Sequence, residues 1–85
     1  MPAKFFDITK KADKEISKLP LTIHRKINKA FDIIKENPLE GEKLHGVLKG
    51  YYKLRVGDYR IIYVFNAKQS HLTITKIEHR QGVYK

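Results

Sequence analysis

The chain has 85 residues, 41% of them hydrophobic and 32% charged, which is enough for one small domain with a single core and too little for two domains. It contains no cysteine, so disulfide-stapled scaffolds, thiolate zinc modules and cysteine nucleophiles are excluded. Lys and Arg number 18 against 9 Asp and Glu, and this net charge of +9 favours a polyanionic partner such as RNA, DNA or an acidic protein. No apolar run approaches the length of a membrane span and the N-terminus lacks a signal-peptide pattern, so we expect one cytoplasmic domain over residues 1–85 without a membrane partner.

The first half of the chain predicts a strand followed by two helices. Residues 4–8 are typical of a short strand, and Thr9 is placed to cap a helix over residues 10–19. A second helix is expected over residues 21–36. Each helix carries one apolar stripe and is followed by a proline, which predicts a helical hairpin that needs a covering partner.

The second half predicts that partner. Apolar residues alternate through residues 51–56, 59–66 and roughly 72–77, which indicates an antiparallel meander. A glycine-punctuated stretch precedes it, with a short strand near residues 43–48. Alternation breaks inside 72–77, which is consistent with a bulge and prevents assignment of faces by counting. The expected fold class is therefore α+β, with an N-terminal strand and a helical hairpin packed on an antiparallel sheet.

The hairpin around Gly57-Asp58 carries the functional argument. A two-residue loop that begins with glycine places Arg55 directly opposite Arg60. One face of this hairpin is apolar or aromatic and is expected to cover the helices. The other face collects Tyr51, Lys53, Arg55 and Arg60, beside Ile62 and Val64.

Two arginines across a strand pair destabilise a sheet locally, and such conflicts occur where a site needs them. One interpretation is a cationic cup that holds a phosphodiester and stabilises the charge that develops on it. The other is a solvated basic face whose long side chains splay into water. Residues 51–85 carry a net charge of +5 and all five tyrosines, so stacking on bases and simple core packing both stay open for these rings. No carboxylate cluster suits a metal, and we expect neither metal nor cofactor.

The run Tyr51-Tyr52-Lys53-Leu54-Arg55-Val56-Gly57-Asp58-Tyr59-Arg60-Ile61-Ile62-Tyr63, followed by His79-Arg80 and Val83-Tyr84, closely resembles the RelE/ParE superfamily of bacterial and archaeal toxins. The resemblance covers essentially the whole chain and implies a RelE-like fold and a cognate antitoxin. Some branches of this superfamily cleave mRNA on the ribosome. The ParE branch poisons DNA gyrase and does not need the nuclease residues.

The resemblance to the nuclease branch implies a type II toxin that cleaves ribosome-bound mRNA by attack of the ribose 2′-hydroxyl, without a metal. The alternatives are a ParE-like gyrase inhibitor and a non-catalytic RNA-binding relative. His79, which by its sequence alone is more typical of a surface or packing residue, becomes a candidate for proton transfer, whereas His24, His45 and His71 are interpreted as surface or loop residues. The implied catalytic residues are Lys53, Arg55, Arg60, His79, Arg80 and Tyr84.

Overall fold

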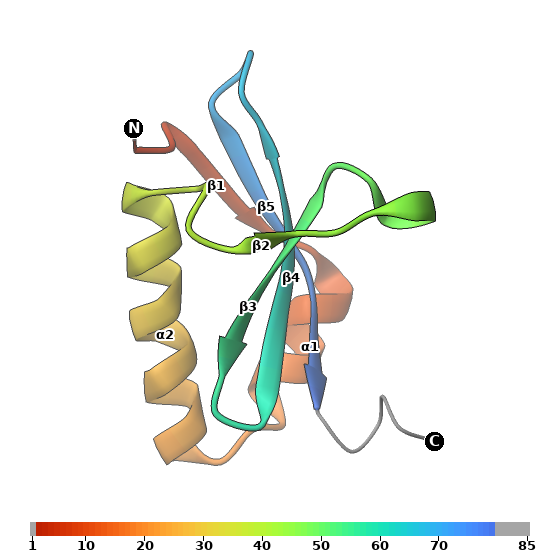
Figure 1. Ribbon diagram of the computed structural model, residues 1–85. Helices are drawn as coiled ribbons and strands as arrows, with labels where there is room; N and C mark the ends of the chain where they lie inside the picture. Colours follow the sequence, from red (N-terminus) through yellow and green to blue (C-terminus); the bar gives the residue numbers. More distant parts are fainter. Residues whose placement is uncertain (1, 80–85) are drawn as a thin grey trace.

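The computed structural model describes residues 2–79, which form a mixed sheet with two helices packed on one of its faces (Figure 1). The strand order across the sheet is β1-β5-β4-β3-β2. This α+β architecture is the predicted fold class. Its elements are β1 (Phe5–Ile8), α1 (Lys10–Ser17), α2 (Leu21–Glu36), β2 (Glu42–Lys43), the short 3-10 helix η1 (Gly46–Leu48), β3 (Tyr51–Val56), β4 (Tyr59–Asn66) and β5 (His71–His79).

Helix α1 begins where the capping pattern predicts. Thr9 is extended, and its side-chain oxygen accepts a hydrogen bond from the N–H of Ala12, which satisfies one of the free donors of α1. The helix ends at Ser17, two residues before the predicted end, because the chain tightens into a turn in which the Leu19 N–H bonds to the Ile16 carbonyl. Helix α2 has the predicted bounds.

Strands β3, β4 and β5 form the predicted antiparallel meander. Gly57 has φ +59°, as the two-residue loop requires, and Val56 pairs with Tyr59. The predicted strand over residues 43–48 is wrong beyond its first residue. Gly46 takes φ +72°, a left-handed conformation that ends the extended chain, and η1 follows instead.

Strand β1 lies at the edge of the sheet and runs parallel to β5, with Phe6 beside Leu72. This pairing joins two ends of the described chain, and it has no signature in local sequence. The core lies between the helices and the sheet, and Tyr63, Ile61, Ile27 and Ile34 are fully buried there. Within residues 2–79, no helix combines the length and the apolar character that a membrane span needs.

Candidate functional site

The sheet face opposite the helices carries two rows of side chains across its strands. In one row Arg55 of β3 lies opposite Arg60 of β4, which lies opposite Glu78 of β5. The next row has Lys53, Ile62 and Lys76 in the same order, with Glu42 of β2 paired to Lys53. The predicted basic face is therefore present. Its cations lie at adjacent positions because β3 pairs with β4 and β4 pairs with β5.

Three of these side chains and one carboxylate enclose a polar hollow of about 260 Å³, which we call the cationic hollow. Its lining residues are Glu42, Lys53, Arg55 and Arg60. The Lys53 and Arg60 side chains are 31% and 25% exposed, so both are held against the sheet with their charged ends accessible. Lys53 Nζ lies 3.9 Å from Glu42 Oε1. Within residues 2–79, no carboxylate forms an ion pair with Arg55, which leaves its guanidinium available to an anion.

An acidic residue that the sequence analysis did not select, Glu78, lies at the border of this hollow. Its Oε1 is 3.3 Å from Arg60 Nη2, and its Oε2 is 2.8 Å from Lys76 Nζ. Each oxygen of the carboxylate thus contacts a different cation. The signal that could have identified it is the pairing of β4 with β5, which counting residues could not establish because the strand contains a bulge.

That bulge lies at Thr75, since Tyr63 pairs with Ile74 and Ile62 pairs with Lys76, leaving Thr75 as the extra residue. It is held from two sides: the Thr75 hydroxyl donates to the Ile62 carbonyl at 2.9 Å, and the Thr9 hydroxyl donates to the Thr75 carbonyl at 2.9 Å. The bulge inverts the alternation of β5 after Ile74. Ile77 therefore faces the core, while Lys76 and Glu78 face the cationic side.

A carboxylate from α1 completes the support of the bulge. Glu15 Oε1 accepts a hydrogen bond from the Ile77 N–H at 2.8 Å. Helix α1 packs on β5, so the contact joins the two layers beside the basic face. The position of Glu78 thus depends on α1 as well as on its own strand.

The other candidate residues divide between two groups. His79 pairs with Tyr59, and its ring packs edge-on against the Tyr59 ring with centroids 4.7 Å apart. Tyr59 packs against the core, so this contact places His79 on the sheet face opposite that of Arg60. Arg80 and Tyr84 lie outside the described residues. The structure therefore brings together Lys53, Arg55 and Arg60 among the six candidates and separates His79 from them.

The remaining histidines have local roles. His71 is the first residue of β5 and therefore lies in a strand, not in a loop. Its Nε2 lies 2.6 Å from Asp7 Oδ2. His24 lies on α2 with its Nδ1 3.4 Å from Asn28 Nδ2, and His45 is exposed just before η1. None of them lines the cationic hollow.

A buried tyrosine fixes the segment that delivers Glu42 to the hollow. The Tyr63 hydroxyl donates to the Pro38 carbonyl at 2.8 Å and accepts from the Gly41 N–H at 2.9 Å. Burial raises the pKa of Tyr63 to about 12, partly offset by the Gly41 hydrogen bond. Gly41 leaves room for this arrangement, because a Cβ there would lie 2.5 Å from the Tyr63 hydroxyl oxygen and 2.8 Å from the Lys53 carbonyl oxygen.

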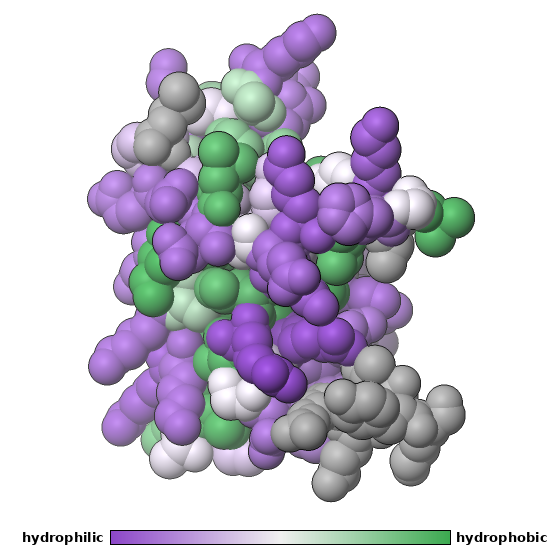
Figure 2. All heavy atoms as spheres, viewed as in Figure 1, coloured by the Kyte–Doolittle hydropathy of each residue, from purple (hydrophilic) through white to green (hydrophobic). Residues whose placement is uncertain are grey.

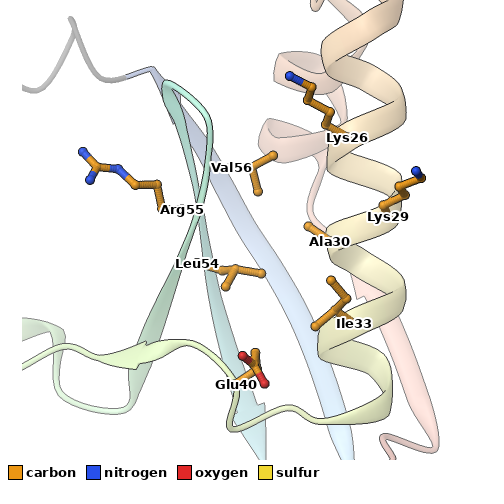
Figure 3. A pocket seen from close by; sticks show the side chains of 8 residues that line it. All are labelled: Lys26, Lys29, Ala30, Ile33, Glu40, Leu54, Arg55 and Val56. Atoms are coloured by element: carbon orange, nitrogen blue, oxygen red, sulfur yellow. The ribbon is translucent and has the colours of Figure 1, made fainter.

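A second hollow of about 280 Å³ lies between α2 and β3, and we call it the helix groove (Figure 3). Leu54 and Val56 of β3 point towards Ala30 and Ile33 of α2 and form its apolar surface. Figure 2 shows apolar surface between α2 and the sheet, bordered by hydrophilic side chains. The charged residues that line the groove are Lys26, Lys29, Arg55 and Glu40. Arg55 thus lines both hollows.

Comparison with known proteins identifies the family. Residues 6–84 match the family model described as the ParE toxin of the type II toxin-antitoxin system parDE. A protein named RelE1, from Methanocaldococcus jannaschii, is 32% identical over 83 residues, which cover 93% of this chain and 92% of that protein. The chain belongs to the RelE/ParE superfamily of type II toxins.

Solved structures of RelE/ParE toxins agree with the fold. The RelBE2 toxin-antitoxin complex of Mycobacterium tuberculosis contains a chain with a TM-score of 0.84 and 28% identity, over 94% of both chains. A chain of the archaeal RelE-RelB complex of Pyrococcus horikoshii gives a TM-score of 0.76 at 28% identity, over 92% of this chain and 96% of that one. These similarities confirm the predicted RelE-like arrangement of a helical hairpin on an antiparallel meander.

Proposed function

We propose that this toxin is a ribosome-dependent mRNA endonuclease that cleaves by attack of the ribose 2′-hydroxyl on the adjacent phosphodiester, without a metal ion. The observation that supports it most strongly is the cationic hollow, in which Lys53, Arg55 and Arg60 converge from two paired strands. A pentacoordinate phosphate gains negative charge as it forms, and cations fixed in advance on a rigid sheet stabilise that charge without reorganising. Arg60 and Arg55 suit phosphate oxygens because the guanidinium donates in a planar fork.

Proton transfer must accompany the displacement. Glu42 is the carboxylate among the residues that line the hollow, and it is the proposed acceptor of the 2′-proton as the 2′-oxygen attacks phosphorus. The bond to the 5′-oxygen then breaks, and an acid supplies the proton that this leaving oxygen needs. Tyr84 is proposed as the donor of that proton and Arg80 as a second cation that stabilises the phosphate, as the resemblance implies, whereas His79 lies on the opposite face of the sheet and is not proposed for this step. The products are a 2′,3′-cyclic phosphate and a 5′-hydroxyl.

The test is a bacterial cell-free translation reaction in which the 5′-ends of the mRNA are mapped. Wild type should cut within codons only when ribosomes are translating. Arg60→Ala should slow cleavage at least 100-fold, equivalent to about 3 kcal/mol of transition-state stabilisation. Arg25→Ala, which removes an exposed arginine of α2, is the matched control and should leave the rate unchanged. Intact mRNA with wild type, or near-normal cleavage by Arg60→Ala, would contradict the proposal.

A second candidate function, inhibition of DNA gyrase, is favoured by the match to the ParE family model over residues 6–84. A supercoiling assay with purified gyrase tests it. In this case Arg60→Ala should inhibit as strongly as wild type, because a gyrase inhibitor does not need a phosphate-cleaving site. A non-catalytic RNA-binding protein would bind mRNA without cutting it and leave supercoiling intact.

The proposed stable partner is a cognate antitoxin, of which an acidic amphipathic segment occupies the helix groove. The groove supplies apolar contacts from both layers, and its lining has three cations against the single carboxylate of Glu40. An amphipathic helix with acidic flanks complements both features. Several similar chains were solved as toxin-antitoxin complexes, including the intact RelBE complex of E. coli.

Co-expression with the antitoxin encoded beside this toxin tests the groove. Ile33→Asp places a carboxylate on the apolar surface and should weaken binding at least tenfold, as measured by calorimetry. Leu21→Asp is the matched control, since Leu21 is 67% exposed on the same helix and does not line the groove. Equal loss of affinity in both variants would exclude the groove as the docking site.

A further inference from the structure

We propose that Glu78 is a positioning residue that holds the guanidinium of Arg60 in place for the substrate phosphate, and that Lys76 keeps this carboxylate from cancelling the positive field of the hollow. The inference rests on the proposed function, because it assigns a role within the same site. It begins from the unusual order of charges across the sheet, where a carboxylate follows two arginines in one row.

An acid beside a cationic site can either compete with phosphate for the cations or hold one of the cations in place, and the geometry distinguishes these two roles. An acid inside the hollow would compete with phosphate for the cations. Glu78 does not line the cationic hollow, whereas Arg60 does. Arg60 therefore lies between the hollow and Glu78, whose Oε1 lies 3.3 Å from Arg60 Nη2. A guanidinium has five N–H donors, so most of them are left for an anion in the hollow.

The second contact of Glu78 explains how its charge is compensated. Lys76 Nζ lies 2.8 Å from Oε2, closer than Arg60 lies to Oε1. The two acid–base contacts use different oxygens of one carboxylate, so Lys76 can neutralise Glu78 while Glu78 still restrains Arg60. Their side chains are between a quarter and about a third exposed, which limits both screening by water and the freedom of the arginine to swing away.

The proposed reaction requires the Arg60 guanidinium to be in position when the phosphate binds. Arg55 directly opposes Arg60, and the repulsion between two neighbouring guanidinium groups pushes them apart unless something restrains one of them. Glu78 attracts Arg60 from the side away from Arg55. It sets the distance between the two forks in the absence of substrate, so that less ordering is needed when the phosphate enters.

Two measurements test this role. The first observes the Nε–H signal of Arg60 by NMR relaxation in the free protein. In wild type this signal should show restricted motion, and in Glu78→Gln it should become as mobile as that of the exposed Arg25. Asp32→Asn is the matched control, because it removes an equal charge from an acid–lysine pair on α2, with Lys35 at 3.8 Å, and should leave the Arg60 signal unchanged.

The second is a double-mutant cycle on the cleavage rate. Glu78→Ala should lower kcat about tenfold in the wild-type background, with little change in KM, and should have no further effect in the Arg60→Ala background. Equal losses in both backgrounds, or an Arg60 signal unaffected by Glu78→Gln, would overturn the positioning role. If wild type cleaves no mRNA, the proposed function fails, and the relaxation comparison still decides whether Glu78 holds Arg60.

Discussion

Removing one oxygen atom from the core tests how the segment before β2 is anchored. Tyr63→Phe deletes a hydroxyl that donates to the Pro38 carbonyl at 2.8 Å and accepts from the Gly41 N–H at 2.9 Å. The ring is fully buried, so water cannot replace either hydrogen bond without entering the core. Two lost hydrogen bonds and two backbone groups left without a partner correspond to about 2–3 kcal/mol of unfolding free energy. For a domain of this size the melting temperature should fall by roughly 10–15 °C.

Because of the same hydroxyl, part of the free energy of unfolding is lost at alkaline pH. Burial raises the pKa of Tyr63 from 10.0 to about 12, so the folded protein holds this proton more tightly than the unfolded chain does. Its contribution is therefore fully present below pH 10 and is lost as the pH rises from 10 towards 12. The loss is about 1.4 kcal/mol per pH unit over that window. The stability difference between wild type and Tyr63→Phe should accordingly shrink from about 2–3 kcal/mol at pH 8 to nearly zero at pH 12.

Urea unfolding of both proteins at a series of pH values, followed by circular dichroism, measures this difference. Tyr59→Phe is the matched control, since the Tyr59 hydroxyl makes no hydrogen bond within residues 2–79 and its ring is only partly buried. It should change the free energy of unfolding by less than about 0.5 kcal/mol. A Tyr63→Phe protein as stable as wild type at pH 8, or a difference that stays constant to pH 12, would refute the reasoning.

Two further predictions concern contacts around the basic face. Gly41→Ala should lower the free energy of unfolding in urea by about 1–3 kcal/mol, because the added Cβ would lie 2.5 Å from the Tyr63 hydroxyl oxygen. Combining it with Tyr63→Phe should lower the free energy of unfolding by less than the sum of the two single effects. Full additivity would contradict the clash. Glu15→Ala should cost about 1.5–3 kcal/mol, since it leaves the Ile77 N–H beside the bulge without its charged acceptor. In hydrogen exchange the Ile77 amide should lose protection more than other amides of β5, and a uniform loss along the strand would show that Glu15 does not act locally.

The elements whose bounds the sequence predicted are those bordered by a proline or by a glycine turn. Helix α2 lies between Pro20 and the pair Asn37-Pro38, and the hairpin turns at Gly57-Asp58, so the bounds of both were readable. The pairing of Arg55 with Arg60 followed from the loop length alone. The end of α1 was harder to place although Pro20 follows it, because the helix stops at Ser17 through a turn that its apolar stripe did not reveal.

The rest of the site depends on partners far apart in the sequence. The bulge at Thr75 is stabilised by Thr9 and Glu15, residues 60 or more positions away, and no local pattern indicates those contacts. The role of Glu78 follows from the bulge, because the bulge determines which face of the sheet the residue occupies. The lysine and arginines of the hairpin were therefore predictable, whereas the acidic residues beside them were not.

The parallel pairing of β1 with β5 limits how early the toxin can complete its fold during synthesis. A ribosome makes β5 more than 60 residues after β1, yet the two strands are neighbours in the sheet. Such distant pairing forms slowly, and it cannot begin until β5 has left the exit tunnel. Lys76 and Glu78 are part of β5, the strand that supports Arg60. A nascent copy whose β5 has not yet emerged from the ribosome therefore lacks the complete basic face.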